Sequence, residues 1–327
     1  MTRGREVVLS VSCLVLASLV FGTMVAWGQS HGPVTAKAEE PGDFTIKTTS
    51  RLVLLDVSVK DTSGGFVTGL SKDDFKVYEN GMQQQITQFA NADIPVTVGI
   101  AVDESGSMRR KRSEVVTAAL VFNQASNPMD EMFIINFNEK ARRGLPDDVL
   151  FSDDVQKLRQ ALYQGQPEGR TALYDAIEMA LNQLEFGRQA KKTLIVISDG
   201  GDNHSKHTLE EVTHHVLASL VTIYTIGIYD EDDPEKNEGV LRKLAQVSGG
   251  GFYHPKTLPE IVPICRQIAK DVRTRYTIGY VPATEGKTIR HLKVAAAAPD
   301  HPKLAVRTRT SYAFLPDQPV SPEKAGP

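Results

Sequence analysis

The chain has 327 residues, of which 41% are hydrophobic and 24% charged, and its formal net charge is −3. This length allows one full domain and a second small one, but not three. The composition is ordinary for a globular protein, and the weakly acidic balance excludes a broad electrostatic case for nucleic-acid binding.

The N-terminal segment has the pattern of an export signal. An apolar run from Val7 to Trp27 follows two arginines and ends in a small-x-small sequence. This predicts a signal peptide over residues 1–28, with an uncleaved anchor as the alternative, because about 20 apolar residues can span a bilayer. We therefore expect an exported protein, located in the periplasm, in the cell envelope or outside the cell. Residues 29–44, rich in Gly, Pro, Ala and Glu, predict a flexible linker.

Residues 45–92 predict a small β module. Short alternating stretches of apolar and polar residues are broken by turn residues such as Gly64 and Gly65. They indicate about four strands. The module has too few apolar residues to form a stable core by itself.

From Ile94 onward, apolar strands alternate with helical patterns. The strands are expected near 96–103, 131–137, 193–198 and 221–228, and the helices near 109–125, 153–164, 172–186, 207–219, 238–247 and 258–273. Solidly apolar strands between helices indicate a parallel sheet that is covered on both faces. Residues 93–274 are therefore predicted to form a doubly wound α/β domain with a mostly parallel sheet.

After Arg273 the helices stop, and residues 275–315 contain β-like runs. Each flanking β segment alone would leave an apolar face exposed. We therefore expect 275–315 to pair with 45–92 in a small β sandwich, with the α/β domain inserted between its halves. The proline-containing tail, 316–327, is predicted to be disordered.

Five oxygen-bearing side chains follow strands or precede a helix of the α/β domain. Asp103, Ser105 and Ser107 alternate after the first strand, Thr171 precedes a helix, and Asp199 follows a later strand. The loops at the carboxyl ends of parallel strands share one edge of the sheet, where ligands bind. Oxygen ligands with little total charge suit a hard cation such as Mg²⁺. The alternative is that the two aspartates only cap turns and helices.

These five residues match the pattern D-x-S-x-S…T…D. On that match, the chain resembles a von Willebrand factor type A domain with a complete metal-ion-dependent adhesion site, over roughly residues 93–274. The segments on both sides resemble those of exported acidobacterial type A domain proteins, a family with no well-defined activity. The resemblance implies that the three hydroxyl groups contact Mg²⁺ or Mn²⁺ directly, and that the two aspartates act directly or through water. It also implies one open coordination position for water or for a carboxylate of a protein partner.

We therefore expect an exported, adhesion-type, protein-binding module that captures an acidic group of its partner. Glu104 is expected to point outward and to form a partner-binding rim with Arg109 and Arg110. The run RRKR at 109–112 by itself first predicts the solvated start of a helix, with a rim that attracts an acidic partner as the alternative. An alternative function is a scaffold subunit of a cell-envelope complex with a structural metal. No enzyme is expected, because the chain lacks catalytic motifs such as G-x-S-x-G and H-E-x-x-H. No nucleic-acid partner is expected, and a membrane is involved only if the N-terminal segment stays uncleaved.

Four other features need separate interpretation. The histidines His204, His207, His214 and His215 predict a solvated helix face, with a zinc site as the alternative. The acidic run 230–235 predicts a solvated loop, with Ca²⁺ binding as the alternative. Cys265 is expected to be a buried structural thiol, and Cys13 lies inside the predicted signal, so the mature chain would have no intramolecular disulfide. Gly249-Gly250-Gly251 is expected to be a turn before a strand.

Overall fold

The computed structural model describes residues 52–229, 236–283 and 288–314. The predicted signal (1–28), the linker (29–44), Cys13, the acidic run at 230–235 and the tail at 316–327 lie outside the described residues. Within the described ranges, no helix is long and apolar enough to cross a membrane.

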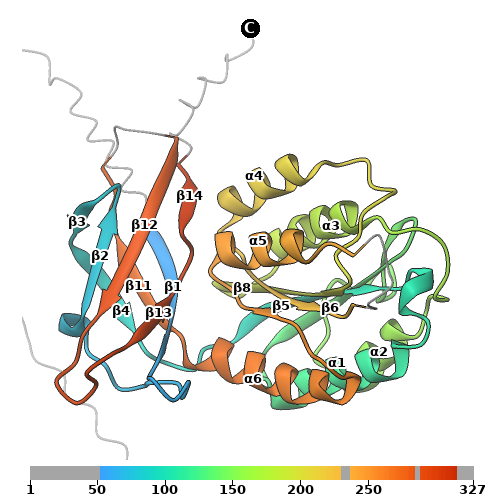
Figure 1. Cartoon of the computed structure of the whole chain (residues 1–327), viewed down its shortest axis with the longest axis horizontal. Coiled ribbons are helices and arrows are strands. Elements are labelled where there is room, and N and C mark those ends of the chain that lie inside the picture. Colours follow the sequence, from blue (N-terminus) through green and yellow to red (C-terminus); the bar gives the residue numbers. More distant parts are fainter. Residues whose placement is uncertain (1–51, 230–235, 284–287, 315–327) are drawn as a thin grey trace, which may run out of the picture. The chain divides into compact units, whose positions relative to one another are not determined.

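A six-stranded sheet forms the centre of the α/β domain, with the strand order β10-β9-β8-β5-β6-β7 (Figure 1). Its parallel strands are β5 (Val96–Asp103), β6 (Glu131–Phe137), β8 (Lys191–Ser198), β9 (Thr222–Gly227) and β10 (Phe252–Tyr253). The short edge strand β7 (Ala141–Arg143) runs antiparallel to β6. Strands β5, β6 and β9 are buried along their whole length, as their largely apolar sequences predict.

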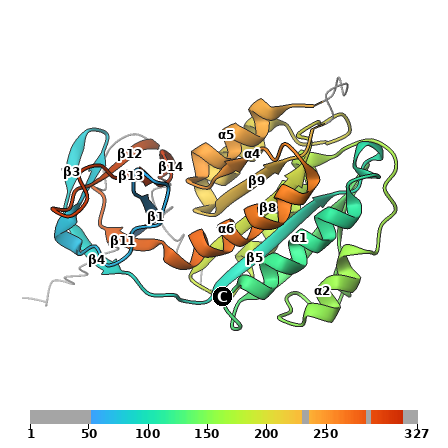
Figure 2. The same ribbon diagram turned by 60° about the horizontal axis from the view of Figure 1, so that its bottom comes forward.

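Helices cover both faces of this sheet. On one face lie α1 (Arg112–Ala125), α2 (Val155–Leu162) and α6 (Ile261–Thr274), and on the other lie α3 (Leu173–Glu185), α4 (Leu209–Ser219) and α5 (Glu238–Ser248) (Figure 1, Figure 2). The expected doubly wound, mostly parallel α/β fold is confirmed.

The helix ends follow local sequence signals. Asp154 caps α2 by accepting hydrogen bonds from two backbone amides, and Thr208 forms a capping box with Glu211 at the start of α4. Two helices begin three residues later than the sequence indicates. The 3-10 helix Leu258–Glu260 (η3) occupies the predicted first turn of α6, and before α1 the 3-10 helix Gly106–Met108 (η2) is followed by a turn at 109–111. A third 3-10 helix, η1, covers Lys72–Asp74.

The flanking segments form two four-stranded sheets. One has the order β13-β1-β11-β4 and the other β14-β12-β2-β3. Their strands are β1 (Val53–Lys60), β2 (Phe75–Glu79), β3 (Met82–Gln84), β4 (Ile86–Ala90), β11 (Tyr276–Tyr280), β12 (Ile289–Ala296), β13 (Ala305–Arg307) and β14 (Ser311–Ala313). Each sheet joins strands that precede the α/β domain to strands that follow it: β1 pairs with β11, and β2 with β12.

One apolar core lies between these two sheets. It contains Leu55 of β1 and Tyr276 of β11 from the first sheet, and Val77 of β2 and Tyr312 of β14 from the second. The two sheets therefore form a β sandwich. The exact limits of the predicted domains stay predictions.

Contacts of Asp271 connect the sandwich strands to the α/β domain. Asp271 of α6 accepts hydrogen bonds from Ser58 of β1 (2.5 Å) and Tyr224 of β9 (2.6 Å), and it forms an ion pair with Arg307 of β13.

The glycines at 249–251 form the predicted turn before β10 and also pass close to β9. A Cβ atom on Gly250 would lie 1.8 Å from the carbonyl oxygen of Ile223. Only glycine allows this approach of the backbone to β9.

Candidate metal centre

The two predicted aspartate ligands lie at one edge of the central sheet. Asp103 is the last residue of β5, and Asp199 directly follows β8. Strands β5 and β8 are parallel neighbours, so their carboxyl ends lie side by side. Both side chains are buried, with exposed fractions of 3% each.

Asp103 is held in place by its neighbours. Its Oδ1 accepts a hydrogen bond from the backbone N–H of Ser105 (2.8 Å), and its Oδ2 accepts one from the Ser198 hydroxyl (2.6 Å). The first contact shapes the loop that carries the predicted serine ligands. The second connects the ends of β5 and β8. Ser198 was not predicted from the sequence, although its place at the end of a strand is a signal for a role at this edge.

The two serines connect their loop to Asp199. The hydroxyl oxygens of Ser105 and Ser107 lie 3.0 Å apart, and the Ser107 hydroxyl donates to Oδ2 of Asp199 at 2.6 Å. Four of the five predicted ligands are thus linked with Ser198 in one hydrogen-bonded chain, in which the backbone N–H of Ser105 makes the link to Asp103.

Thr171 lies in a third loop that meets the first. The backbone N–H of Gly106 donates to the carbonyl oxygen of Gly169 at 3.2 Å. The Thr171 N–H donates to the side chain of Asn203 (2.9 Å), and its carbonyl oxygen accepts from the Asn203 N–H (3.0 Å). These contacts of Thr171 are made by its backbone, and they join the loop to the one that follows Asp199. The structure thus places the threonine in the same set of three loops.

The electrostatics of the two carboxylates favour a cation. Burial and, next, the negative charge of Asp199 raise the pKa of Asp103 to about 7, while the hydrogen bonds from Ser198 and Ser105 act in the opposite direction. A bound divalent ion would offset this repulsion. The donor set of carboxylate and hydroxyl oxygens also fits Mg²⁺ or Mn²⁺.

Residues 98–201 match the family model of the von Willebrand factor type A domain. The chain contains a von Willebrand factor type A domain. The matched segment includes the three loops that carry Asp103, Thr171 and Asp199.

Solved structures similar to the chain include proteins with this domain. One, described as von Willebrand factor type A from Catenulispora acidiphila, is 14% identical, with 82% of this chain and 75% of that chain covered and a TM-score of 0.49. The vWF domain of the type V pili tip protein Mfa5 from Porphyromonas gingivalis is 14% identical, with coverages of 56% and 97% and a TM-score of 0.43. Proximal thread matrix protein 1 from the mussel byssus, with a zinc-occupied MIDAS motif, is 14% identical, with coverages of 55% and 48% and a TM-score of 0.44. No curated protein matches the chain.

The prediction that Glu104 points outward from the type A domain is wrong. Its side chain is 2% exposed and forms ion pairs with Arg112 (3.3 Å) and Arg142 (3.8 Å). Burial raises the pKa of Glu104, and the two arginines counteract this effect. The side chain fills space beside Gly165, where a Cβ atom would lie 1.5 Å from the Glu104 Oε2. Glu104 therefore supports the metal loop from inside and does not belong to the partner-binding rim.

The basic run at 109–112 divides between surface and interior. Arg109 and Arg110 are exposed beside the metal loop, and the Arg109 Nε donates to the carbonyl oxygen of Pro167 at 3.1 Å. Lys111 is buried, and its ammonium group donates to the carbonyl oxygen of Ile228 at 2.9 Å. The run is therefore not uniformly solvated, and its two exposed arginines remain available as a rim.

Two of the four histidines at 204–215, His207 and His215, contact carboxylates. The Nδ1 of His207 lies 2.7 Å from Asp175, and the Nδ1 of His215 lies 2.7 Å from Glu178. In the described part of the chain, no group of three or more His, Cys, Asp or Glu side chains could hold a metal ion. A cation bound at the sheet edge would thus depend on hydroxyl ligands in addition to the two aspartates.

Proposed function

We propose that the type A domain binds Mg²⁺ or Mn²⁺ and uses the ion to bind a carboxylate of a protein partner. The observation that supports this most is the convergence of buried Asp103 and Asp199 with the hydroxyl groups of Ser105 and Ser107 at one sheet edge. Two adjacent buried carboxylates repel each other unless a positive charge lies between them or one is protonated.

The predicted ligands and the residues that support them would have different roles in cation binding. Ser105, Ser107 and Thr171 would contact the cation directly, and Asp103 and Asp199 would do so directly or through water. When bound, the ion would supply positive charge and a coordination position for a carboxylate of the partner. Ser198 fixes the Asp103 carboxylate, and Glu104 fixes the loop through its ion pairs with α1 and β7.

Selection of the partner would involve the exposed charges beside the site. Arg109 and Arg110 are exposed next to η2, so they add positive potential at the edge where a partner would approach. Such charges raise the rate of association with acidic surfaces more than they raise affinity. We propose an exported protein whose partner lies outside the cytoplasm, because residues 1–28 have the sequence pattern of a secretory signal.

Binding, rather than catalysis, fits the chemistry of the site. The neighbours of the open position are hydroxyl groups and carboxylates that would be engaged by the cation. A metal-assisted hydrolase needs a general base aimed at its reacting water, and these side chains would be occupied by the cation instead. The alternative is a scaffold subunit in which all coordination positions are filled by this chain and the metal is purely structural.

Water-proton relaxation of bound Mn²⁺ separates these functions. We expect the full chain to bind Mn²⁺ with exchangeable water on the ion, and we expect acetate, but not acetamide, to displace that water and reduce the relaxation enhancement. Thr171→Ala should weaken Mn²⁺ binding, whereas Asp147→Ala, which removes a carboxylate whose side chain is 99% exposed, should not. Bound Mn²⁺ without exchangeable water would favour the structural metal.

A further inference from the structure

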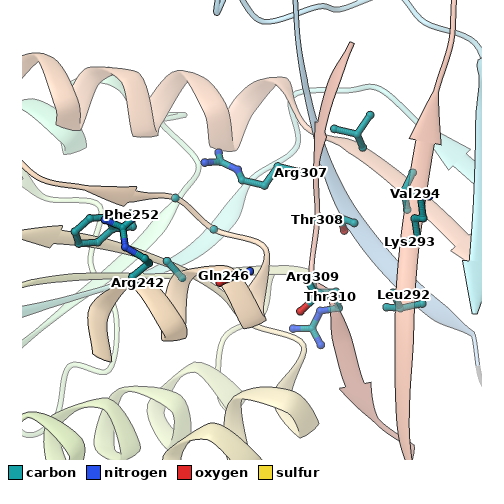
Figure 3. A pocket seen from close by; sticks show the side chains of 14 residues that line it. Arg242, Gln246, Phe252, Leu292, Lys293, Val294, Arg307, Thr308, Arg309 and Thr310 are labelled. Carbon is teal, nitrogen blue, oxygen red and sulfur yellow. The ribbon is translucent and has the colours of Figure 1, made fainter. Parts of the chain in front are cut away.

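A second site is indicated by a cavity of about 500 Å³ that lies between α5 and strands β12 and β13. Figure 3 shows Arg242, Gln246 and Phe252 on one side of this cavity, and the segment Arg307–Thr310 with Leu292–Val294 on the other. None of the lining residues belongs to the candidate metal centre.

The charge of the cavity wall is entirely positive. Its lining includes Arg242, Lys293, Arg307 and Arg309, and in the part of the chain that the structure describes it includes no aspartate or glutamate. Two of these cations have carboxylate partners outside the lining, since Arg242 pairs with Glu238 and Arg307 with Asp271. Lys293 is exposed, and Arg309 is 4% exposed.

Arg309 is a buried cation that forms no ion pair with any described residue. Its Nη2 donates to the carbonyl oxygen of Val221 at 3.3 Å, while its Nη1 is buried without a hydrogen-bond partner among the described residues. Burial lowers the pKa of Arg309 to about 10, and the charge of Asp56 only partly opposes this. The structure places no carboxylate within ion-pair distance of it in the described ranges. Buried charges are otherwise paired in folded proteins, so a missing anion is indicated.

Unsatisfied donors extend along the same strand segment. The Thr308 hydroxyl and the Arg307 Nε are also buried without hydrogen-bond partners among the described residues. Together with Arg309, three consecutive residues that line the cavity thus have unused hydrogen-bonding atoms. Such groups are costly to bury and are usually satisfied by a ligand, an ion or water.

The walls also offer apolar surface. Phe252, against whose ring the Arg242 guanidinium stacks at 4.4 Å, lines the cavity together with Leu292 and Val306. The volume is within the range of small-molecule sites, about 300–1,000 Å³, and well above that needed for a single inorganic ion. A ligand with an anionic head and an apolar body would fit both parts of the wall.

We propose that this cavity binds a small organic anion with a phosphate head. The phosphate would be recognised by Lys293 of β12, Arg307 of β13 and Arg309. Arginine suits this task because its planar guanidinium group binds phosphate oxygens in a bidentate manner. This site does not depend on the proposed cation site.

Calorimetric titration of the full chain with phenyl phosphate and with inorganic phosphate tests this proposal, at constant ionic strength and with EDTA present. We expect saturable binding of phenyl phosphate, weaker binding of inorganic phosphate, and affinity at least about tenfold lower for Arg309→Gln, which loses one charge-assisted contact. Lys293→Gln changes an exposed side chain and therefore leaves folding intact, and it should also weaken binding.

The matched control is Arg159→Gln, which removes an exposed arginine of α2 outside the cavity and should bind as the wild type does. Equal affinity for both phosphates would restrict the ligand to the free ion and overturn the organic part of the proposal. No saturable binding, or unchanged affinity in both cavity variants, would overturn the site itself. Asp103→Ala should keep phosphate binding, which separates this test from the test of the cation site.

Discussion

At the scale of single residues, Cys265 shows how burial controls reactivity. The predicted burial is confirmed, since the side chain is 1% exposed on the apolar side of α6, and burial raises the pKa of its thiol to about 12. The thiolate is the form that reacts with alkylating reagents. A structural thiol in the core should therefore be almost inert at neutral pH.

We predict that iodoacetamide at pH 8 labels Cys265 at least about a hundredfold more slowly in the folded chain than in urea. Mass spectrometry of the peptide that contains Cys265 gives the rate without interference from Cys13. A Thr62→Cys variant, in an exposed turn, is the positive control. Fast labelling of Cys265 in the folded chain would show that its side of α6 is open to solvent.

The sequence predicts the positions of some side chains around the metal loop but not of others. Asp103 and Asp199 each follow an apolar strand, so their places at the sheet edge can be derived from the strand pattern. The inward position of Glu104 could not be derived, because its partners Arg112 and Arg142 come from a helix and an edge strand whose approach is a tertiary property. Local alternation gives no information about such contacts.

At the scale of elements, α6 is attached to strands on both sides by one carboxylate. Asp271 is fully buried and contacts Ser58, Tyr224, Arg275 and Arg307. Burial alone would raise its pKa, but Arg275 and Arg307 hold the pKa of Asp271 below its usual value. The bounds of α6 were predicted to within a few residues from periodicity, whereas this attachment could not be, because its partners are far apart in the sequence.

The pH dependence of stability follows from this shift. Since the pKa of Asp271 is lower in the folded state, its contribution to the free energy of unfolding is present above the unfolded pKa of about 3.9 and is lost as the pH falls through the folded value. We predict that Asp271→Asn is about 3 kcal/mol less stable than the wild type at pH 7, because two arginines lose their counterion. Below pH 4 the difference should shrink.

Urea unfolding of both proteins at pH 7 and at pH 3.5 measures this difference. Asp147→Asn serves as the control, because that carboxylate is 99% exposed. A difference that stays constant with pH would assign the effect of Asp271 to its shape and hydrogen bonds instead of its charge.

At the scale of the whole described chain, the β sandwich depends on both ends of the sequence. Glu79 of β2 accepts hydrogen bonds from Tyr280 of β11 (2.6 Å) and Tyr312 of β14 (2.7 Å), and it pairs with Arg290 of β12. A buried carboxylate thus connects one early strand to three late ones. Each flanking β segment has few apolar residues, which indicated that the two segments form a core only together. The strand register and the hydrogen-bond network of Glu79 cannot be derived from local sequence patterns, because they join residues far apart in the chain.

We predict that a chain ending at Val281 does not fold stably. The truncation removes β12, which pairs with β2, and it leaves Glu79 without its arginine and one of its tyrosines. Soluble expression and a thermal unfolding transition measure the effect, with the full chain as reference. A cooperative transition at the temperature of the full chain would show that the early strands and the α/β domain are independent of the late ones.

The central claim is that the edge of the type A domain binds a divalent cation, and calorimetric titration of the full chain with Mn²⁺ and Mg²⁺ tests it most directly. We predict saturable binding at one site for the wild type and for Asp147→Ala, and loss of that binding for Asp103→Ala. Equal binding by the wild type and Asp103→Ala, or no binding by any of the three proteins, would contradict the claim.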